Sequence, residues 1–159
     1  MKRQQLEGGG NLLFICNAWI RVKTLERGGQ LMNTEEKLSV IKTFVHAYNA
    51  FDIETMMSLL HPEFEFRHIS SGRTSVIASS HKEYRDFIEY GAELFSSRKL
   101  TVMDIQEVND RITAGIVYAG VLAVDLPDGL KAGDTLKHQG CHEYTFRDGM
   151  IYRVTDIDQ

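Results

Sequence analysis

The chain has 159 residues, with 18 Lys and Arg against 22 Asp and Glu for a net charge of −4, and 43% of its residues are hydrophobic. This length predicts one domain that can bury a core, and this composition is typical of globular rather than disordered chains. The interspersed charges form no basic stripe, which excludes a nucleic-acid phosphate footprint, and the longest apolar run, at 115–124, is too short to span a membrane.

The two cysteines bear on the compartment in which the protein works. Cys16 and Cys141 imply no disulfide framework, which favours a reducing compartment, and we expect a cytoplasmic protein. The apolar stretch at 11–20 is not interpreted as a signal peptide, because no small-residue cleavage site follows it.

The first residues lack the regularity of the rest. Residues 1–31 show no clear period and no helix caps, and the codons for residues 27–29 can contain a bacterial ribosome-binding sequence ahead of Met32. We therefore expect 1–31 to be a poorly structured extension, or a leader that is not part of the native protein. A single domain is predicted at 32–159.

Hydrophobic periodicity predicts three helices in the first half of the chain. Asn33 followed by Glu36 is a typical helix start, and apolar residues recur at helical spacing over 35–50. Asp52 is suited to cap a second, short helix, and Ser80 begins a capping box that opens a third. The expected inner stripe of the first helix is Leu38, Ile41, Val45 and Tyr48, widened by Val40, Phe44 and Ala47.

Strand signals follow the first helices and dominate the second half. The sequence EFEFRHI at 63–69 alternates, which places Phe64, Phe66 and His68 on one face of a strand, and the Gly-, Ser- and Thr-rich stretch at 70–80 is predicted as a loop. Helices that precede a run of strands indicate an α+β fold with a largely antiparallel sheet. The later strands are predicted at about 99–109, 112–125, 135–146 and 150–158.

This order of elements resembles the SnoaL-like branch of the nuclear-transport-factor-2-like superfamily over about residues 34–159. The resemblance rests on AYNAFDIETMMSLLHPEFEFRH (47–68) and YTFRDGMIYRVTDID (144–158). It implies a curved, mostly antiparallel sheet that wraps a long N-terminal helix into a cone with an apolar pocket. The superfamily holds polyketide cyclases, ketosteroid isomerases, dehydratases, epoxide hydrolases and members that only bind, so the fold alone does not give the chemistry.

A metal site at the two histidines of HQGCH is rejected on spacing. His138 and His142 share a strand face, but four residues of regular strand separate them by about 13 Å. A zinc ion requires ligands at about 2 Å, so one ion cannot be held by both. No metal is predicted.

The final hairpin allows two registers around the Asp-Gly turn. A two-residue turn pairs Tyr144 with Arg153, whereas a three-residue loop with a bulge pairs Glu143 with Arg153. We prefer the bulged loop because it brings opposite charges together; Gly140 then lies opposite Asp156. The resemblance implies that the face containing Asp156 lines the cone. That face would collect His138, Gly140, His142, Tyr144 and Phe146 with Met150, Tyr152, Val154, Asp156 and Asp158.

The candidate catalytic residues lie on this face. A carboxylate such as Asp156 loses hydration there, so its pKa should rise unless a cation or donor meets it, and the candidate partner is His68. The resemblance implies that the position of His68 holds the base of ketosteroid isomerases and that of Asp156 a catalytic carboxylate of epoxide hydrolases. A His–Asp pair suits proton transfer near neutral pH. His142 and Tyr48 are predicted as donors to a developing oxyanion.

The sequence also departs from these relatives. The phenol with which ketosteroid isomerases polarise a carbonyl falls on Phe44, and the Arg and Asp of epoxide hydrolases fall on Ala119 and Val121. Both activities are therefore disfavoured. Structural roles stay open for every candidate: His68 at a pocket rim, His142 and Asp156 within the sheet, and Asp158 in solvent.

The strand at 115–124 is apolar on both faces, and its exposed side predicts a partner surface. We expect Val117, Ala119, Val121 and Ala123 on the inner face and Tyr118, Leu122 and Val124 on the outer face. The resemblance favours a homodimer through the outer face. The predicted ligand-binding residues are Phe44, Tyr48, Phe66, Val121, His138, Tyr144 and Val154.

Together these patterns give two leading hypotheses. The first is a small cofactor-independent acid–base enzyme of isomerase, cyclase or dehydratase type, with His68, Asp156 and His142 as catalytic residues and a small, mostly apolar carbonyl or hydroxyl compound as substrate. The second is a non-catalytic ligand-binding or dimerisation module. A catalyst requires His68 and Asp156 within hydrogen-bond reach or one water apart, and a binder does not.

Overall fold

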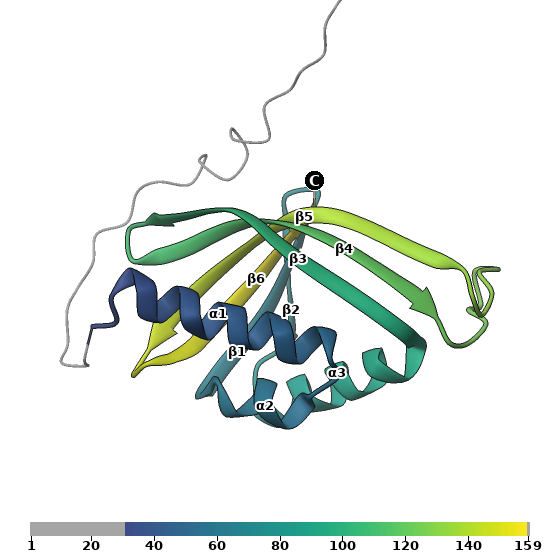
Figure 1. Ribbon diagram of the computed structural model, residues 1–159, viewed down its shortest axis with the longest axis horizontal. Helices are drawn as coiled ribbons and strands as arrows, with labels where there is room; N and C mark the ends of the chain where they lie inside the picture. The colour runs from purple at the N-terminus through teal and green to yellow at the C-terminus, as the bar shows by residue number, and fades with distance from the viewer. Residues whose placement is uncertain (1–30, 159) are drawn as a thin grey trace, which may run out of the picture.

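A computed structural model describes residues 31–158 of the chain. A curved, unclosed sheet of six strands forms one layer, and three helices lie against one of its faces (Figure 1). This architecture confirms the predicted α+β fold. The elements are α1 (Thr34–Asn49), α2 (Ile53–Ser58), β1 (Leu60–Ser70), β2 (Arg73–Ala78), α3 (His81–Leu94), β3 (Phe95–Val108), β4 (Arg111–Leu122), β5 (Thr135–Arg147) and β6 (Met150–Asp158).

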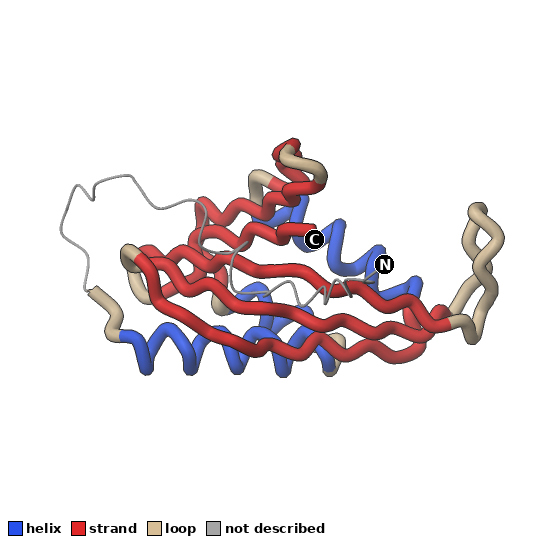
Figure 2. The backbone as a smooth tube through the Cα atoms, turned by 90° about the horizontal axis from the view of Figure 1, so that it is seen from above, coloured by secondary structure: helices blue, strands red, loops and turns tan. Residues whose placement is uncertain are grey.

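The strand order places the beginning and the end of the domain side by side. The order is β2-β1-β6-β5-β4-β3, and every neighbouring pair is antiparallel except β1 and β6, which run parallel. Residues of β1 and β6 that are far apart in sequence therefore become neighbours in the sheet. The loop at 123–134 extends beyond the end of the sheet (Figure 2).

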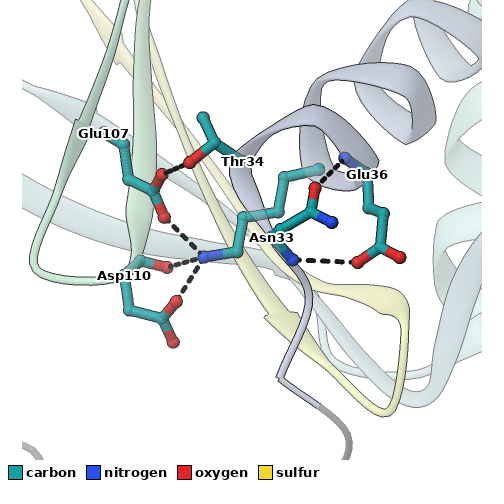
Figure 3. A network of polar contacts seen from close by, with 6 residues as sticks. Asn33, Thr34, Glu36, Glu107 and Asp110 are labelled. Carbon is teal, nitrogen blue, oxygen red and sulfur yellow. Dashed lines mark hydrogen bonds and ion pairs between the residues drawn. The ribbon is translucent and has the colours of Figure 1, made fainter.

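The start of α1 combines a capping box with a buried ion pair (Figure 3). The Asn33 side chain accepts from the Glu36 N–H at 2.9 Å, and the Glu36 carboxylate accepts from the Asn33 N–H at 2.8 Å. One turn on, Lys37 is 2% exposed and pairs with Glu107 at 2.7 Å and with Asp110. These contacts fix the first turn of α1 to the turn between β3 and β4.

The ionisation of this pair follows from its contacts. Burial lowers the pKa of Lys37, but hydrogen bonds to Asp110 and Glu107 outweigh burial, so the pKa is raised. The hydrogen bond from Lys37 lowers the pKa of Glu107 in turn. A buried lysine shifts the covered stripe of α1 from the predicted one: Lys37, Ile41, Phe44 and Ala47 are buried, whereas Leu38, Val45 and Tyr48 are only partly covered.

The other two helices begin where the sequence predicts. Asp52 caps α2 through the Thr55 N–H, and Ser80 caps α3 through the Glu83 N–H at 3.2 Å. The box at α3 is only half formed, because the Glu83 carboxylate accepts from the Ser79 N–H at 2.7 Å instead. The core between helices and sheet includes Ile41, Phe44, Met56, Leu60, Phe64, Tyr84, Ile88, Ile112, Tyr144, Ile151 and Val154.

The predicted loop at 70–80 is wrong, because it contains strand β2. Arg73–Ala78 pairs antiparallel with β1 at the edge of the sheet. Five of its six residues are exposed, so the strand has no buried face that would impose an apolar alternation on the sequence.

The predicted faces of β4 are also reversed. Ile112 belongs to the core, and the Tyr118 ring packs edge-on against Tyr48 of α1 with ring centroids 6.4 Å apart. Even-numbered residues of β4 therefore face the helices; we call this the inner face of the sheet. Val121 and Ala119 lie on the opposite, outer face, because side chains alternate along an uninterrupted strand. Since both faces of β4 are apolar, the sequence does not indicate which face packs against the helices.

The preferred register of the final hairpin is wrong. Arg147 pairs with Met150 across a two-residue turn, and a bulge between Thr145 and Phe146 then shifts the ladder so that Tyr144 pairs with Val154. The predicted Glu143–Arg153 pair does not form. Glu143 accepts instead from Arg111 at 3.0 Å, and Arg153 pairs with Glu65 at 3.2 Å. The bulge nevertheless keeps His142, Tyr144, Val154 and Asp156 on one face, as predicted.

Several predictions concern residues outside the described range. The extension or leader at 1–31 is described only at its last residue, and Cys16 lies in the part that is not described. No helix within 31–158 is long and apolar enough to cross a membrane.

Candidate functional site

Three strands bring the candidate residues together on the inner face. In the parallel pairing of β1 with β6, His68 lies beside Asp156, and in the antiparallel pairing of β5 with β6, His142 lies opposite Asp156. Gly140 faces Asp158, not Asp156 as predicted, and the place that a Cβ would take lies only 2.6 Å from the Ile157 carbonyl oxygen, so Gly140 leaves no free space there. Residues from β1, β5 and β6 thus meet at one end of the sheet.

The resulting His–Asp cluster consists of His68, His138, His142, Asp156 and Asp158. His68 reaches both aspartates: Nδ1 lies 3.5 Å from Asp156 Oδ2, and Nε2 lies 3.1 Å from Asp158 Oδ2. His138 Nε2 lies 3.4 Å from Asp158 Oδ1, and His142 Nε2 lies 3.4 Å from Asp156 Oδ1. Histidines and aspartates therefore alternate in one connected row.

The row runs from a covered end to an open end. The His142 side chain is 11% exposed, whereas those of His68 and Asp158 are each 31% exposed and that of His138 is 38% exposed. A small molecule can therefore approach His68 without displacing the core, and His142 supports the row from behind.

The buried end of the row is fixed by a phenol. His142 Nδ1 lies 2.9 Å from the Tyr144 hydroxyl, and burial raises the pKa of Tyr144, so the phenol stays protonated and can donate to Nδ1. This suits the tautomer in which His142 carries its proton on Nε2 and directs it towards Asp156. His142 Nε2 thus faces Asp156 Oδ1 at 3.4 Å.

Asp156 stays ionised despite its surroundings. Burial raises its pKa, but the hydrogen-bonding contact with His142 and the electrostatic interactions with the imidazoles of His142, His138 and His68 together outweigh burial and lower the pKa. The sequence predicts a raised pKa unless a cation or donor meets the carboxylate, and the histidines meet that condition. Asp156 is therefore an anion that stabilises a protonated imidazole beside it.

Tyr48 of α1 approaches the same region from the helix layer. Burial raises the pKa of its phenol, and the charge of Asp156 adds to this, while Arg98 acts in the opposite direction. A neutral phenol in this position is a hydrogen-bond donor at physiological pH.

The predicted ligand-binding residues divide into three groups. Phe44, Tyr144 and Val154 are at most 3% exposed and belong to the hydrophobic core. Phe66 packs against Tyr84 with ring centroids 5.6 Å apart, the Tyr48 phenol interacts electrostatically with Asp156, and His138 belongs to the cluster itself. Val121 lies on the outer face, so its predicted place in the pocket is wrong.

A separate depression of about 630 Å³ lies at the other end of the domain. It is lined by residues of α1 and of the final turn, namely Met32, Glu36, Ser39, Val40, Asp148 and Gly149. It contains none of the predicted site residues. The predicted site residues therefore lie away from this depression.

Part of the cluster has the donor atoms that a cation requires. His68, Asp156 and Asp158 each offer one ligand atom, and these atoms lie within 4.8 Å of one another. This set differs from the His138–His142 pair that strand spacing excludes. One imidazole and two carboxylates could hold a divalent ion.

The sequence underestimated two residues of the site. Asp158 was expected in solvent, yet it contacts both His68 and His138. The period of two from Asp156 was the available signal, since it places Asp158 on the same strand face. His138 was predicted only as a ligand contact, and its pairing with Asp158 depends on the register of β5 against β6.

The comparisons with known proteins assign the family. The family model for the SnoaL-like domain matches residues 41–154. The chain belongs to the SnoaL-like family. No curated protein matches it at a significant level.

Solved structures of the nuclear-transport-factor-2-like fold share this architecture. AclR from Streptomyces galilaeus, a candidate hydroxylase, is 19% identical over 80% of this chain and 91% of its own, with a TM-score of 0.65. IdmH from Streptomyces antibioticus, a candidate polyketide cyclase, is 18% identical over 77% and 91%, with a TM-score of 0.63. A candidate polyketide cyclase from Xanthomonas campestris pv. campestris is 22% identical over 80% and 93%, with a TM-score of 0.61. At these identities the likeness establishes the fold.

Proposed function

We propose that this SnoaL-like protein is a small, cofactor-independent acid–base catalyst of isomerase, cyclase or dehydratase type. Its substrate would be a small, mostly apolar carbonyl or hydroxyl compound. The observation that carries the proposal is the approach of His68 Nδ1 to Asp156 Oδ2 at 3.5 Å. The description of IdmH and of the Xanthomonas protein as candidate polyketide cyclases supports this class of reaction.

His68 is the proton-transfer group in this proposal. It lies at the open end of the cluster, and the anionic Asp156 and Asp158 stabilise its imidazolium form after it accepts a proton. Removal of a proton next to a carbonyl leaves an enolate oxygen. Tyr48 is the predicted donor to that oxygen, because its phenol is neutral and adjoins the cluster.

His142 takes a different role from the one predicted from sequence. Both of its ring nitrogens face protein groups, Tyr144 on one side and Asp156 on the other, and its side chain is nearly buried. We therefore propose His142 as a positioning residue that acts through Asp156.

Proton exchange tests the proposal without knowledge of the natural substrate. Ring ketones would be incubated with the protein in D₂O, and the loss of α-proton NMR signals would be followed over time. General acid–base groups contribute about 10²–10⁴-fold, so His68→Gln and Asp156→Asn should each slow exchange by at least about 100-fold. His46→Gln, which changes an exposed histidine of α1, serves as the matched control.

The outcome separates enzyme from binder. Exchange at the rate of the buffer, combined with ligand-induced shifts at His68, would contradict catalysis. Because no cofactor is proposed, EDTA should leave the exchange rate unchanged. Loss of exchange on EDTA treatment and its return with added Zn²⁺ would instead assign a metal to His68, Asp156 and Asp158.

One observation favours the alternative, a ligand-binding module without catalysis. Phe44, Tyr144 and Val154 fill the interior where an apolar pocket was predicted, so a substrate would contact mainly the rim of the cluster. A molecule held at the rim excludes less water, and acid–base catalysis is weaker where water competes. The exchange experiment distinguishes these functions directly.

The remaining expectations concern partners and location. We propose a homodimer through the outer face of the sheet, where Val117, Ala119 and Val121 are half-buried in the single chain. A small apolar ligand, a cytoplasmic location and the absence of nucleic-acid and membrane partners remain predictions from the sequence.

A further inference from the structure

Arg98 of β3 is a buried cation that lacks a carboxylate partner among the described residues. It is 7% exposed, and its guanidinium lies over the Tyr48 ring at 3.7 Å and the Phe51 ring at 4.3 Å. Its Nε donates to the Tyr48 carbonyl at 2.8 Å, whereas its Nη2 is buried with no hydrogen-bond partner. The arginines that do form ion pairs in the described part of the chain are Arg67, Arg85, Arg111, Arg147 and Arg153.

This arrangement stabilises the charge only in part. An arginine side chain stays protonated inside proteins, and stacking on aromatic rings offsets part of its lost hydration. A buried donor without an acceptor still carries the cost of desolvation, which an anionic oxygen would remove. Nη2 is therefore a donor for which the described residues supply no acceptor.

A second unmatched donor lies at the same level of the sheet. The Tyr118 hydroxyl is buried and makes no geometrically defined hydrogen bond within 31–158, and the Tyr48 phenol is its polar neighbour. A Cβ placed on Gly120 would come within 2.6 Å both of that hydroxyl and of the Phe95 ring, and Gly120 is the residue of β4 directly opposite Arg98. The hydroxyl therefore lies above the backbone position that faces Arg98. Burial raises the pKa of Tyr118, so its phenol remains a donor.

We propose that Arg98 Nη2 and the Tyr118 hydroxyl form a binding site for an anionic oxygen of the substrate, so that the substrate is a ring compound carrying a carboxylate. The proposal rests on the proposed function in one respect: the reacting carbon of the same molecule would lie at His68 and Asp156. The anion site would orient the molecule, and the His–Asp cluster would exchange its proton.

The spacing of the strands sets the size of that molecule. Tyr118 pairs with His138 of β5, and His138 contacts Asp158 of β6, so the anion site and the cluster adjoin along the inner face. Two strand spacings between β4 and β6 amount to about 10 Å. A two-ring aromatic carboxylate has this length, and the 38% exposure of the His138 side chain gives it an approach.

Binding of 2-naphthoate and of its neutral counterpart 2-naphthamide tests the proposal. Dissociation constants would be measured by NMR shift titration for wild type, Arg98→Met, Arg98→Lys, Tyr118→Phe and, as control, Arg73→Met, which changes an exposed arginine of β2. Wild type and the control should bind the carboxylate about 10- to 100-fold more tightly than the amide. Arg98→Met should lose this preference, Arg98→Lys should keep part of it, and Tyr118→Phe should reduce it.

The outcomes separate this inference from the proposed function. Equal binding of the two compounds, no binding of 2-naphthoate, or a preference that survives in Arg98→Met overturns the anion site. Thermal unfolding shows which variants fold; if Arg98→Met does not, the wild-type preference and its change in Tyr118→Phe decide. An intact preference without proton exchange keeps the anion site and removes the catalytic function. Proton exchange of neutral ketones by a protein that does not prefer 2-naphthoate over 2-naphthamide keeps the catalytic function and removes the anion site.

Discussion

Gly140→Ala should damage both the stability of the domain and its His–Asp cluster. A Cβ at Gly140 would lie 2.6 Å from the Ile157 carbonyl oxygen and 3.1 Å from His138 Nε2, where ordinary contact begins at 3.4 Å. The Ile157 peptide must therefore move by about 0.8 Å, the difference between 3.4 and 2.6 Å. This peptide lies between Asp156 and Asp158, so the movement displaces both aspartates from contacts that are already 3.1–3.5 Å long.

The energetic cost follows from overpacking. Forcing an extra methyl group into a packed site costs about 1–3 kcal/mol, and the loss of chain entropy in the unfolded state offsets about 0.4–1 kcal/mol of this. We expect Gly140→Ala to lower the free energy of unfolding by about 1–2 kcal/mol. Gly91→Ala is the matched control, because its Cβ would meet nothing within 4 Å in the helix α3, where alanine is favoured by roughly 0.5–1 kcal/mol.

Urea denaturation of both variants measures the two free energies, and histidine NMR spectra report the cluster. A Gly140→Ala protein with the stability of wild type and unchanged resonances for His68 and His138 would refute the close approach of the β5 and β6 backbones. It would also refute the role of that approach in placing Asp158.

Three further predictions concern ionisation and assembly. Lys37→Met should lower the unfolding free energy by about 1–3 kcal/mol in urea at neutral pH, whereas Lys42→Met, at an exposed position of the same helix, should change it by less than about 0.5 kcal/mol. Because the folded pKa of Lys37 is raised, the contribution of Lys37 to the unfolding free energy is full below its unfolded pKa of 10.5 and is lost as pH rises through the folded pKa. If the wild type is still more stable than Lys37→Met above the folded pKa, this reasoning is contradicted. The folded pKa of Asp156 is lowered, so its contribution to the unfolding free energy is present above pH 3.8 and is lost as pH falls through the folded pKa. In chemical denaturation, Asp156→Asn should therefore lose less stability than wild type as the pH is lowered. An unchanged dependence on acidic pH would contradict the lowered pKa of Asp156. Val117→Glu should convert the expected dimer to a monomer in sedimentation experiments, whereas Tyr90→Glu, at an exposed position of α3, should not. Equal masses for the two variants would exclude the outer face of the sheet as the dimer interface.

Local chemistry in the sequence determined where the helices begin. Asn33 with Glu36, Asp52 and Ser80 each cap a helix through hydrogen bonds that span only three residues, so neighbours in the chain were sufficient to predict them. The alternation before His68 likewise indicated the inner face of β1, because Phe64 on that face is buried whereas Glu63 on the other face is exposed.

Signals that depend on distant residues were not available from the sequence. Lys37 was not part of the predicted inner stripe of α1, because its partners Glu107 and Asp110 are 70 and 73 residues away. The inner face of β4 was predicted wrongly because both faces of that strand are apolar, so the sequence does not indicate which one is buried. The register of the final hairpin was predicted wrongly because a bulge shifts the strand pairing without changing the hydrophobic pattern of the sequence.

The sequence shows which residue types are available for the candidate site, but only the tertiary structure brings those residues together. The period of two in β6 places Asp156 and Asp158 on one face, and the sequence contains this directly. Only the parallel pairing of β1 with β6 brings His68 between them, and only the packing of α1 on β3 buries Arg98 beneath Tyr48. Strand pairing across nearly ninety residues is decided by how the whole sheet buries its inner face, which no local pattern specifies.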